Sequence, residues 1–117
     1  MSVDPAVLES LVARLGDRGP AFRTSLVRTW RDETAARLVE LDTAVAADDG
    51  DRVSRVAHTL RSSSGALGAL ALSALCGRIE ASLRAGEPRD LAADAAALHA
   101  AVSAADAAFT TLWPVPR

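Results

Sequence analysis

Apolar residues recur at helical spacing along most of the chain, and groups of glycine, proline and acidic residues interrupt this recurrence at four places. The pattern predicts five helices, of which the second is about seven turns long. Asp4 and Pro5 suit the N-cap and the first position of the first helix. The interruptions lie at Gly16 to Pro20, at Asp48 to Gly50, at Gly68 and at Gly86 to Pro88.

The periodic apolar positions gather on one face of each helix, and these faces define the expected core. Short connections between long amphipathic helices favour antiparallel neighbours. We therefore predict an all-α, up-and-down antiparallel four-helix bundle, with a short additional N-terminal helix that caps one end. Residues 1–113 form this single domain, and residues 114–117 form a frayed C-terminal tail. The expected core positions are Leu8, Leu11, Val12, Leu15, Phe22, Leu26, Trp30, Leu38, Leu41, Val45, Val53, Val56, Ala57, Leu60, Ser64, Leu67, Leu72, Leu75, Cys76, Ile79, Leu83, Leu91, Ala95, Leu98, Val102, Ala105, Phe109 and Leu112.

Composition and charge narrow the possible partners. The 13 basic residues are outnumbered by 15 acidic ones, so the net charge of −2 gives no electrostatic case for binding nucleic acid. The longest apolar runs fall short of the ~20 residues that span a bilayer, and the N-terminus does not resemble a signal peptide. We expect a cytoplasmic protein with no membrane attachment. The single Cys76 cannot form an internal disulfide, and we assign it no redox role.

A polar stripe runs along the third predicted helix, opposite its apolar face. His58, Arg61, Ser62 and Gly65 stand at offsets of 0, 3, 4 and 7, so the imidazole should face solvent beside one cation and two small residues. Gly65 costs the helix about 1 kcal/mol relative to alanine. Access for a partner to the histidine explains this cost. The alternative is that Ser62 and Gly65 accommodate a neighbouring helix or begin the helix end.

A solvent-exposed imidazole titrates near pH 6.5, so much of it is a neutral nucleophile in the cell, and its phosphorylated form suits onward transfer. Arg61 could offset the charge of an arriving phosphate. Arg52 and Arg55 precede the histidine and could add a local positive field. We interpret both first as ordinary solvated surface, and we keep Arg55 as a candidate partner contact.

The segment from Ala57 to Ala69, with sequence AHTLRSSSGALGA, is followed by Leu72, Leu75, Cys76, Ile79 and Glu80. Together these residues resemble the signature of the histidine-containing phosphotransfer (HPt) family. The resemblance implies that residues 1–113 are an HPt domain and that His58 is its phosphoacceptor. It places Arg61 where the family usually has a basic residue near the phosphoryl group, Gly65 on the docking face and Cys76 in the core. Ser62 stands where the family commonly has glycine, and we keep it as a partner contact.

The same resemblance implies a phosphorelay carrier and not an enzyme. Its expected partners are a response-regulator receiver domain and a sensor histidine kinase or hybrid kinase. The receiver would supply the acceptor aspartate and the magnesium ion, so we expect no cofactor and no metal on this chain. The sequence has no glycine-rich phosphate loop, and autophosphorylation from ATP is not expected. Because one chain has enough helices to close a bundle, we expect a monomer.

Three alternatives remain open. A dimerisation and phosphoacceptor module of a sensor kinase also exposes a histidine, but it usually has an acidic residue after that histidine, where this chain has Thr59. A metal-binding or haem-binding bundle would need His58, His99 and Cys76 as ligands, and their spacing does not favour it. An adaptor bundle could dock receivers without transferring a phosphoryl group.

Overall fold

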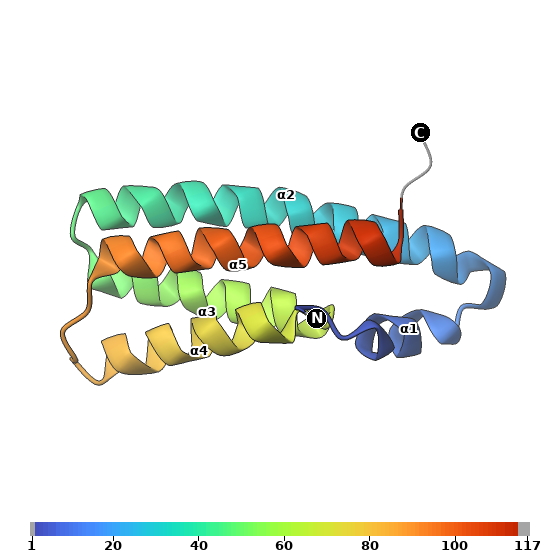
Figure 1. The fold of residues 1–117 in the computed structure, drawn as a ribbon, viewed down its shortest axis with the longest axis horizontal. Helices are drawn as coiled ribbons and strands as arrows, with labels where there is room; N and C mark the ends of the chain where they lie inside the picture. The colour runs from blue at the N-terminus through green and yellow to red at the C-terminus, as the bar shows by residue number, and fades with distance from the viewer. Residues whose placement is uncertain (1, 115–117) are drawn as a thin grey trace.

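The computed structural model of the chain describes residues 2–114, and it is helical throughout that range apart from short connections (Figure 1). Residues 2–114 form five α-helices and one 3-10 turn, which confirms the predicted all-α class. In chain order they are α1 (Pro5–Ala13), a 3-10 turn (Gly16–Arg18), α2 (Gly19–Ala46), α3 (Gly50–Ala66), α4 (Leu70–Arg84) and α5 (Leu91–Leu112).

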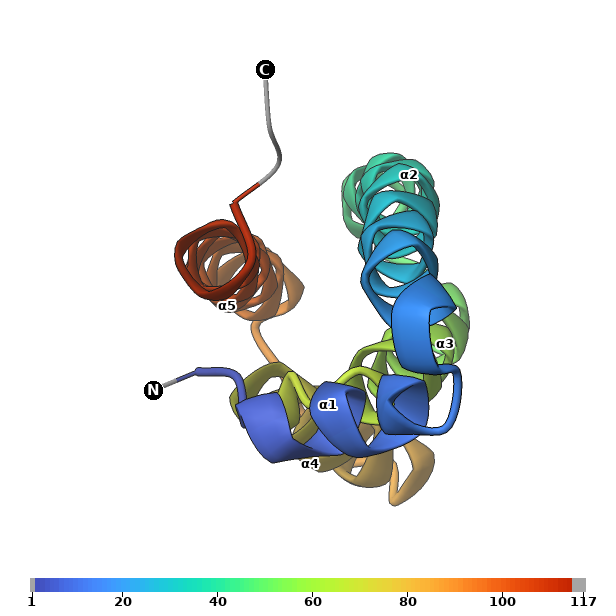
Figure 2. The same cartoon turned by 90° about the vertical axis from the view of Figure 1, so that its right-hand side faces the viewer.

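The four longer helices form an antiparallel bundle. Figure 2 views the bundle from one end and shows α2, α3, α4 and α5 in order around it, with α1 lying across that end. Each of these helices contacts the next one in the chain, and α5 closes the ring against α2. The predicted up-and-down bundle with a capping N-terminal helix is therefore confirmed.

Acidic N-caps begin three of the helices. The carboxylates of Asp4, Asp49 and Asp90 accept hydrogen bonds from backbone N–H groups in the first turns of α1, α3 and α5. Helix α2 begins earlier than predicted, at Gly19, because Pro20 occupies its first turn, where a missing N–H costs nothing. The turn that the sequence pattern placed at Gly19-Pro20 lies at the preceding 3-10 segment instead.

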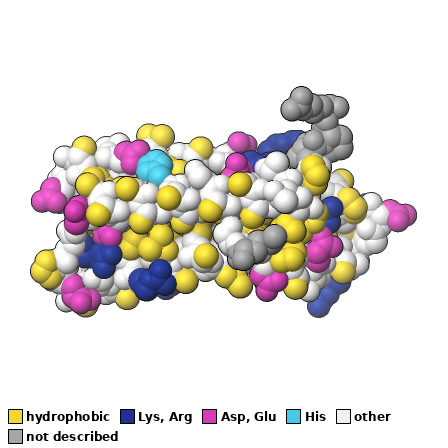
Figure 3. Space-filling view, viewed as in Figure 1, with side chains coloured by type: hydrophobic (Ala, Val, Ile, Leu, Met, Phe, Trp, Pro, Cys, Tyr) yellow, Lys and Arg dark blue, Asp and Glu magenta, His cyan; other side chains and the backbone are white. Residues whose placement is uncertain are grey.

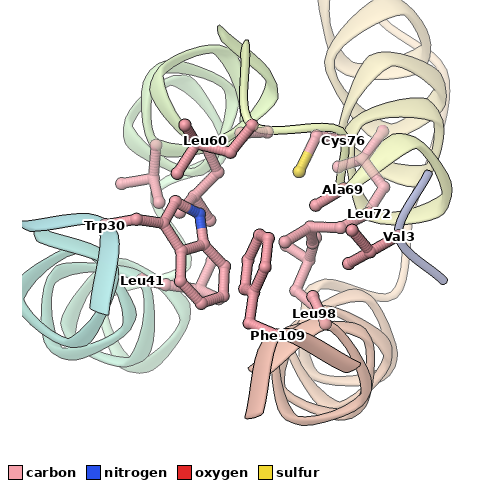
Figure 4. Close-up of a cluster of buried hydrophobic side chains, with 14 of the residues drawn as sticks. Val3, Trp30, Leu41, Leu60, Ala69, Leu72, Cys76, Leu98 and Phe109 are labelled. Carbon is pink, nitrogen blue, oxygen red and sulfur yellow. The ribbon is translucent and has the colours of Figure 1, made fainter. Parts of the chain in front are cut away.

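The core joins all the helices around two aromatic rings (Figure 4). Trp30 of α2 and Phe109 of α5 meet edge to face, with ring centroids 5.0 Å apart. The buried indole N–H donates to the hydroxyl of Ser64 in α3 at 3.1 Å, which satisfies both polar groups and ties α2 to α3. Ser64, an unusual residue for an apolar face, thus has a structural reason to be there.

The N-terminal segment is held against the turn between α3 and α4. The backbone N–H of Asp4 donates to the carbonyl of Gly68 at 2.8 Å. Gly68 has a φ of +87°, and a Cβ at this position would lie 2.5 Å from the carbonyl oxygen of Asp4. Only glycine fits both the backbone conformation and the close approach, so the predicted helix end at Gly68 also positions α1.

Two predicted core positions are exposed. Leu11 and Phe22 are 48% and 42% exposed. Figure 1 shows the N-terminal end of α2 extending beyond α3 and α5, so only the short α1 and the 3-10 turn can cover it. The periodicity of the sequence could not show where the helices that neighbour α2 end. Of the predicted tail, Pro114 has no regular structure, and residues 115–117 lie outside the described residues.

Helix α5 is the one helix within residues 2–114 that is long and apolar enough to cross a membrane by length and composition alone. Half of its residues are alanine, and Asp94, His99 and Asp106 interrupt its apolar character. Core helices of bundles share this composition, and Leu98 and Phe109 of α5 are buried against the other helices. Figure 3 shows charged side chains of both signs scattered over the face of the molecule that is seen in Figure 1.

Leu60 provides a test of the core, since it lies in α3 beneath the polar stripe and is fully buried. Replacing it with alanine should lower the free energy of unfolding by about 2–5 kcal/mol, because the transfer energy is lost and a cavity remains. Leu70→Ala, at a position 48% exposed, is the matched control and should cost about 0.5 kcal/mol or less. Urea denaturation measures both, and equal losses in the two variants would contradict the described core.

Candidate functional site

His58 lies in the middle of α3, on the side away from the core. Its helical neighbours Val56, Ala57 and Leu60 are buried, whereas the imidazole side chain is 48% exposed. The predicted exposure of the histidine is therefore confirmed. A ring in this position is anchored along one edge and open to a second molecule along the other.

The anchor is a buried carboxylate on α4. His58 Nδ1 lies 3.0 Å from Glu80 Oε1 and 3.2 Å from Oε2, and the Glu80 side chain is only 3% exposed. An ionised carboxylate can only accept hydrogen bonds, so Nδ1 carries the hydrogen and donates it. In the neutral ring the lone pair then belongs to Nε2, on the other side of the imidazole.

Two guanidinium groups approach the same carboxylate oxygen. Arg84 Nη2 lies 3.2 Å from Glu80 Oε1, and Arg61 Nη2 lies 3.9 Å from it. Burial alone would raise the pKa of Glu80, but the hydrogen bond from His58 and the charges of Arg61, Arg84 and His58 outweigh burial and lower the pKa below its ordinary value. Glu80 is therefore a carboxylate at neutral pH, as the orientation of His58 requires.

Small residues let α3 and α4 approach closely around this cluster. A Cβ on Gly65 would lie 3.0 Å from Ser73 Oγ, and that hydroxyl donates to the carbonyl of Arg61 at 3.0 Å. On α4, Gly77 lies beneath Arg61, whose Cδ would be 3.4 Å from an added Cβ. Gly65 thus has the packing role that was one alternative from the sequence, and its role in docking stays a prediction.

The remaining predicted contacts occupy different surroundings. Ser62 is exposed one turn after His58 on the same side of α3, and Arg55 is exposed about one turn before it. Arg52 lies 3.8 Å from Glu40 on α2, which is the ordinary surface role expected for it. The structure therefore gathers His58, Arg61 and Ser62 along one exposed side of α3, with Gly65 half-buried at its end.

The candidate ligands of a metal or haem site do not come together. Cys76 is fully buried in the core, as predicted, and burial raises the pKa of its thiol to about 12. His99 lies in α5 and pairs instead with Asp42 of α2, with 2.9 Å between Nε2 and Oδ1. Within residues 2–114, no group of three or more His, Cys, Asp or Glu side chains is arranged to hold a metal ion.

Sequence reasoning did not identify the roles of Glu80 and Arg84. The family resemblance includes Glu80 only as part of its pattern, although the sequence contains a signal that this residue is buried. It directly follows Ile79, in the apolar sector of α4 that also contains Leu72 and Cys76. A carboxylate in such a sector needs cationic or hydrogen-bonding partners, and the exposed stripe of α3 contains both kinds.

Comparison with known proteins identifies the family of the fold. The model of the Hpt domain family matches residues 25–108. A search of curated proteins gives no match. Among solved structures, the chain is similar to the crystal structure of histidine-containing phosphotransfer protein B (HptB) from Pseudomonas aeruginosa PAO1. The similarity has a TM-score of 0.83 at 26% sequence identity and covers 99% of this chain and 97% of HptB.

The chain belongs to the Hpt family, because the family model covers well over half of it and the bundle agrees. It is a histidine phosphotransfer carrier of the kind used in phosphorelays, where such carriers work with two-component kinases and receiver domains. Proteins of this class carry phosphoryl groups and are not kinases. The similarity to HptB extends along almost the whole length of both chains.

The lowered pKa of Glu80 predicts how stability depends on pH. A carboxyl group whose pKa is lower in the folded state stabilises the protein above its unfolded-state pKa, and this contribution is lost as pH falls through the folded-state pKa. Below about pH 4.5, the ordinary value for glutamate, the free energy of unfolding should therefore fall more steeply in the wild type than in Glu80→Gln. Denaturant titrations between pH 2 and 7 would measure the slopes.

Glu87→Gln is the control for this experiment. Glu87 is exposed just after α4 and lies outside the cluster around His58, so the variant controls for the removal of one carboxylate. Parallel curves for the wild type and Glu80→Gln would contradict the described pairing of Glu80.

Proposed function

We propose that this chain accepts a phosphoryl group on Nε2 of His58 and exchanges it with the aspartate of a response-regulator receiver domain. The observation that supports the proposal best is the hydrogen bond between His58 Nδ1 and the buried carboxylate of Glu80. It holds the exposed ring in one tautomer, so that the nitrogen opposite Glu80 is the nucleophile. His99 pairs through its own Nε2, with Asp42, and lacks this arrangement.

The chemistry follows from the tautomer. The Nε2 lone pair attacks the phosphorus of an acyl phosphate, a P–N bond forms, and the P–O bond to the donor aspartate breaks with its electron pair left on the carboxylate. The product ring carries hydrogen on Nδ1 and is positively charged at first, and Glu80 beside it stabilises that charge. Delivery to a receiver reverses the same steps. Arg61 supplies positive charge near the phosphoryl group.

The exposed side of α3 is the proposed docking surface. Ser62 follows His58 one turn later and has a side chain small enough to leave the imidazole accessible. Gly65 continues the surface, and Arg55 lies at its other end. The receiver contributes an acidic pocket and the magnesium ion. The acidic groups of that pocket attract this locally basic side of a chain whose net charge is −2.

The chain itself is proposed to bind neither ATP nor a metal. We place the protein in the cytoplasm, free of membrane and nucleic acid, with α5 serving as a bundle helix. A sensor histidine kinase or hybrid kinase supplies the phosphoryl group, directly or through a receiver. This chain only holds the phosphoryl group between one transfer and the next.

Labelling tests the proposal. Incubation with phosphoramidate, a small phosphoryl donor, should give a phosphoprotein whose label is lost in acid and kept in base, and His58→Gln should take no such label. Adding a receiver domain with magnesium should then move the label to the receiver. His99→Gln is the matched control and should be labelled like the wild type, and ATP with magnesium alone should label none of these proteins.

A folded wild-type protein that takes no label on His58 would contradict the proposed function. It would favour an adaptor that docks receivers without transfer.

The oligomeric state separates this proposal from a sensor-kinase dimerisation module. Since one chain closes its own bundle around Trp30 and Phe109, the protein should sediment as a monomer at all accessible concentrations. Sedimentation equilibrium measures the mass directly. A dimer whose mass does not change on dilution would contradict the expected monomer.

A further inference from the structure

Arg84 belongs to the cluster around His58, although it lies 26 positions later in the chain and at the end of a different helix. Arg84 and the imidazole contact the same oxygen, Glu80 Oε1, at 3.2 and 3.0 Å. The Arg84 guanidinium can therefore be no farther from His58 Nδ1 than the sum of these distances. At 63% exposure, its side chain is also more accessible to a ligand than that of Arg61, which is 43% exposed.

An ordinary surface ion pair does not account for this arrangement. Glu80 and Arg84 are four residues apart, and such pairs commonly stabilise exposed helix faces. Here, however, the acid is 3% exposed and already receives the hydrogen bond from His58. A second guanidinium, that of Arg61, approaches the same oxygen from α3. Two guanidinium groups around one carboxylate leave a surplus of positive charge beside the exposed ring.

We propose that Arg84 is a second phosphoryl-binding cation: once His58 is phosphorylated, its guanidinium is shared between Glu80 and the phosphoryl oxygens. This inference rests on the proposed function and adds a residue to its site. A guanidinium has five N–H donors in a planar fork, so it can keep one contact with a carboxylate while it donates to a phosphate. Arg61 and Arg84 then hold the phosphoryl group from α3 and α4 together.

The expected consequence is a longer-lived phosphohistidine. The phosphoryl group carries close to two negative charges before hydrolysis, and this charge becomes more dispersed as the P–N bond breaks. A nearby cation therefore stabilises the phosphohistidine more than the transition state of hydrolysis. The free energy of a contact between exposed opposite charges, such as Arg84 and the phosphoryl group, corresponds to a change of about two- to fivefold in the hydrolysis rate. Loss of the cation should also raise the pKa of the phosphoryl group, since a neighbouring positive charge favours its dianion.

The test compares Arg84→Gln, Arg84→Lys and Arg78→Gln with the wild type. All are labelled with phosphoramidate, freed of donor and left without a partner, while phosphorus NMR records both the hydrolysis rate and the phosphoryl pKa. Arg78 is exposed on α4 but lies on a different face from Glu80, so it controls for the loss of one positive charge. Thermal unfolding confirms that each variant is folded.

Arg84→Gln should hydrolyse about two- to fivefold faster and show a raised phosphoryl pKa. Arg84→Lys should fall between it and the wild type, and Arg78→Gln should match the wild type. If Arg84→Gln behaves like Arg78→Gln in both measurements, the role of Arg84 is wrong while the proposed function stands. If the wild type takes no label on His58, the proposed function fails and this inference fails with it.

Discussion

The buried carboxylate of Glu80 is the interaction on which the site depends. Removing an ionised carboxylate from water costs several kcal/mol unless charged partners and hydrogen bonds compensate. Here His58 and Arg61 come from α3, and Arg84 comes from the same helix as Glu80. The hydrogen bond from His58 that helps to make the buried charge tolerable is therefore also the contact that orients the imidazole in the proposed phosphoryl-transfer site.

This dependence ties the chemistry to the packing of α3 against α4. The cluster forms only if the two helices approach closely, and the small residues Gly65 and Gly77 allow that approach. Ser73 adds a hydrogen bond from α4 to the backbone of α3 at Arg61. Gly68 closes the turn between the helices and accepts the N-terminal segment at its carbonyl. The bundle thus serves as a rigid support for one exposed ring.

Much of the fold follows from local physics that the sequence displays. Helical periodicity and the breaks near residues 48–50, 68 and 86 predicted the helices and their order, because the burial of one apolar face determines where each helix forms. The exposure of Phe22 could not be predicted, since it depends on where α3 and α5 end relative to α2. The true start of α2 depended on a 3-10 turn that the pattern of Gly19 and Pro20 does not reveal.

The candidate site was predictable only within one helix. The offsets of His58, Arg61 and Ser62 placed them on an exposed side of α3, because residues three and four apart share a face. The partnership with Glu80 and Arg84 spans two helices, and it depends on the register in which α3 and α4 pack. An acidic residue beside Ile79 in an apolar sector signals that a buried charge needs partners, but it does not say which ones.

Nitrogen-15 NMR of the His58 ring, before and after phosphorylation, tests the central claim most directly. In the neutral free protein the hydrogen should reside on Nδ1, and after phosphorylation the phosphorus should couple to Nε2. Glu80→Ala should weaken the tautomer preference of the free ring. Hydrogen on Nε2 in the free protein, or phosphorus on Nδ1 after labelling, would contradict the orientation of His58 by Glu80.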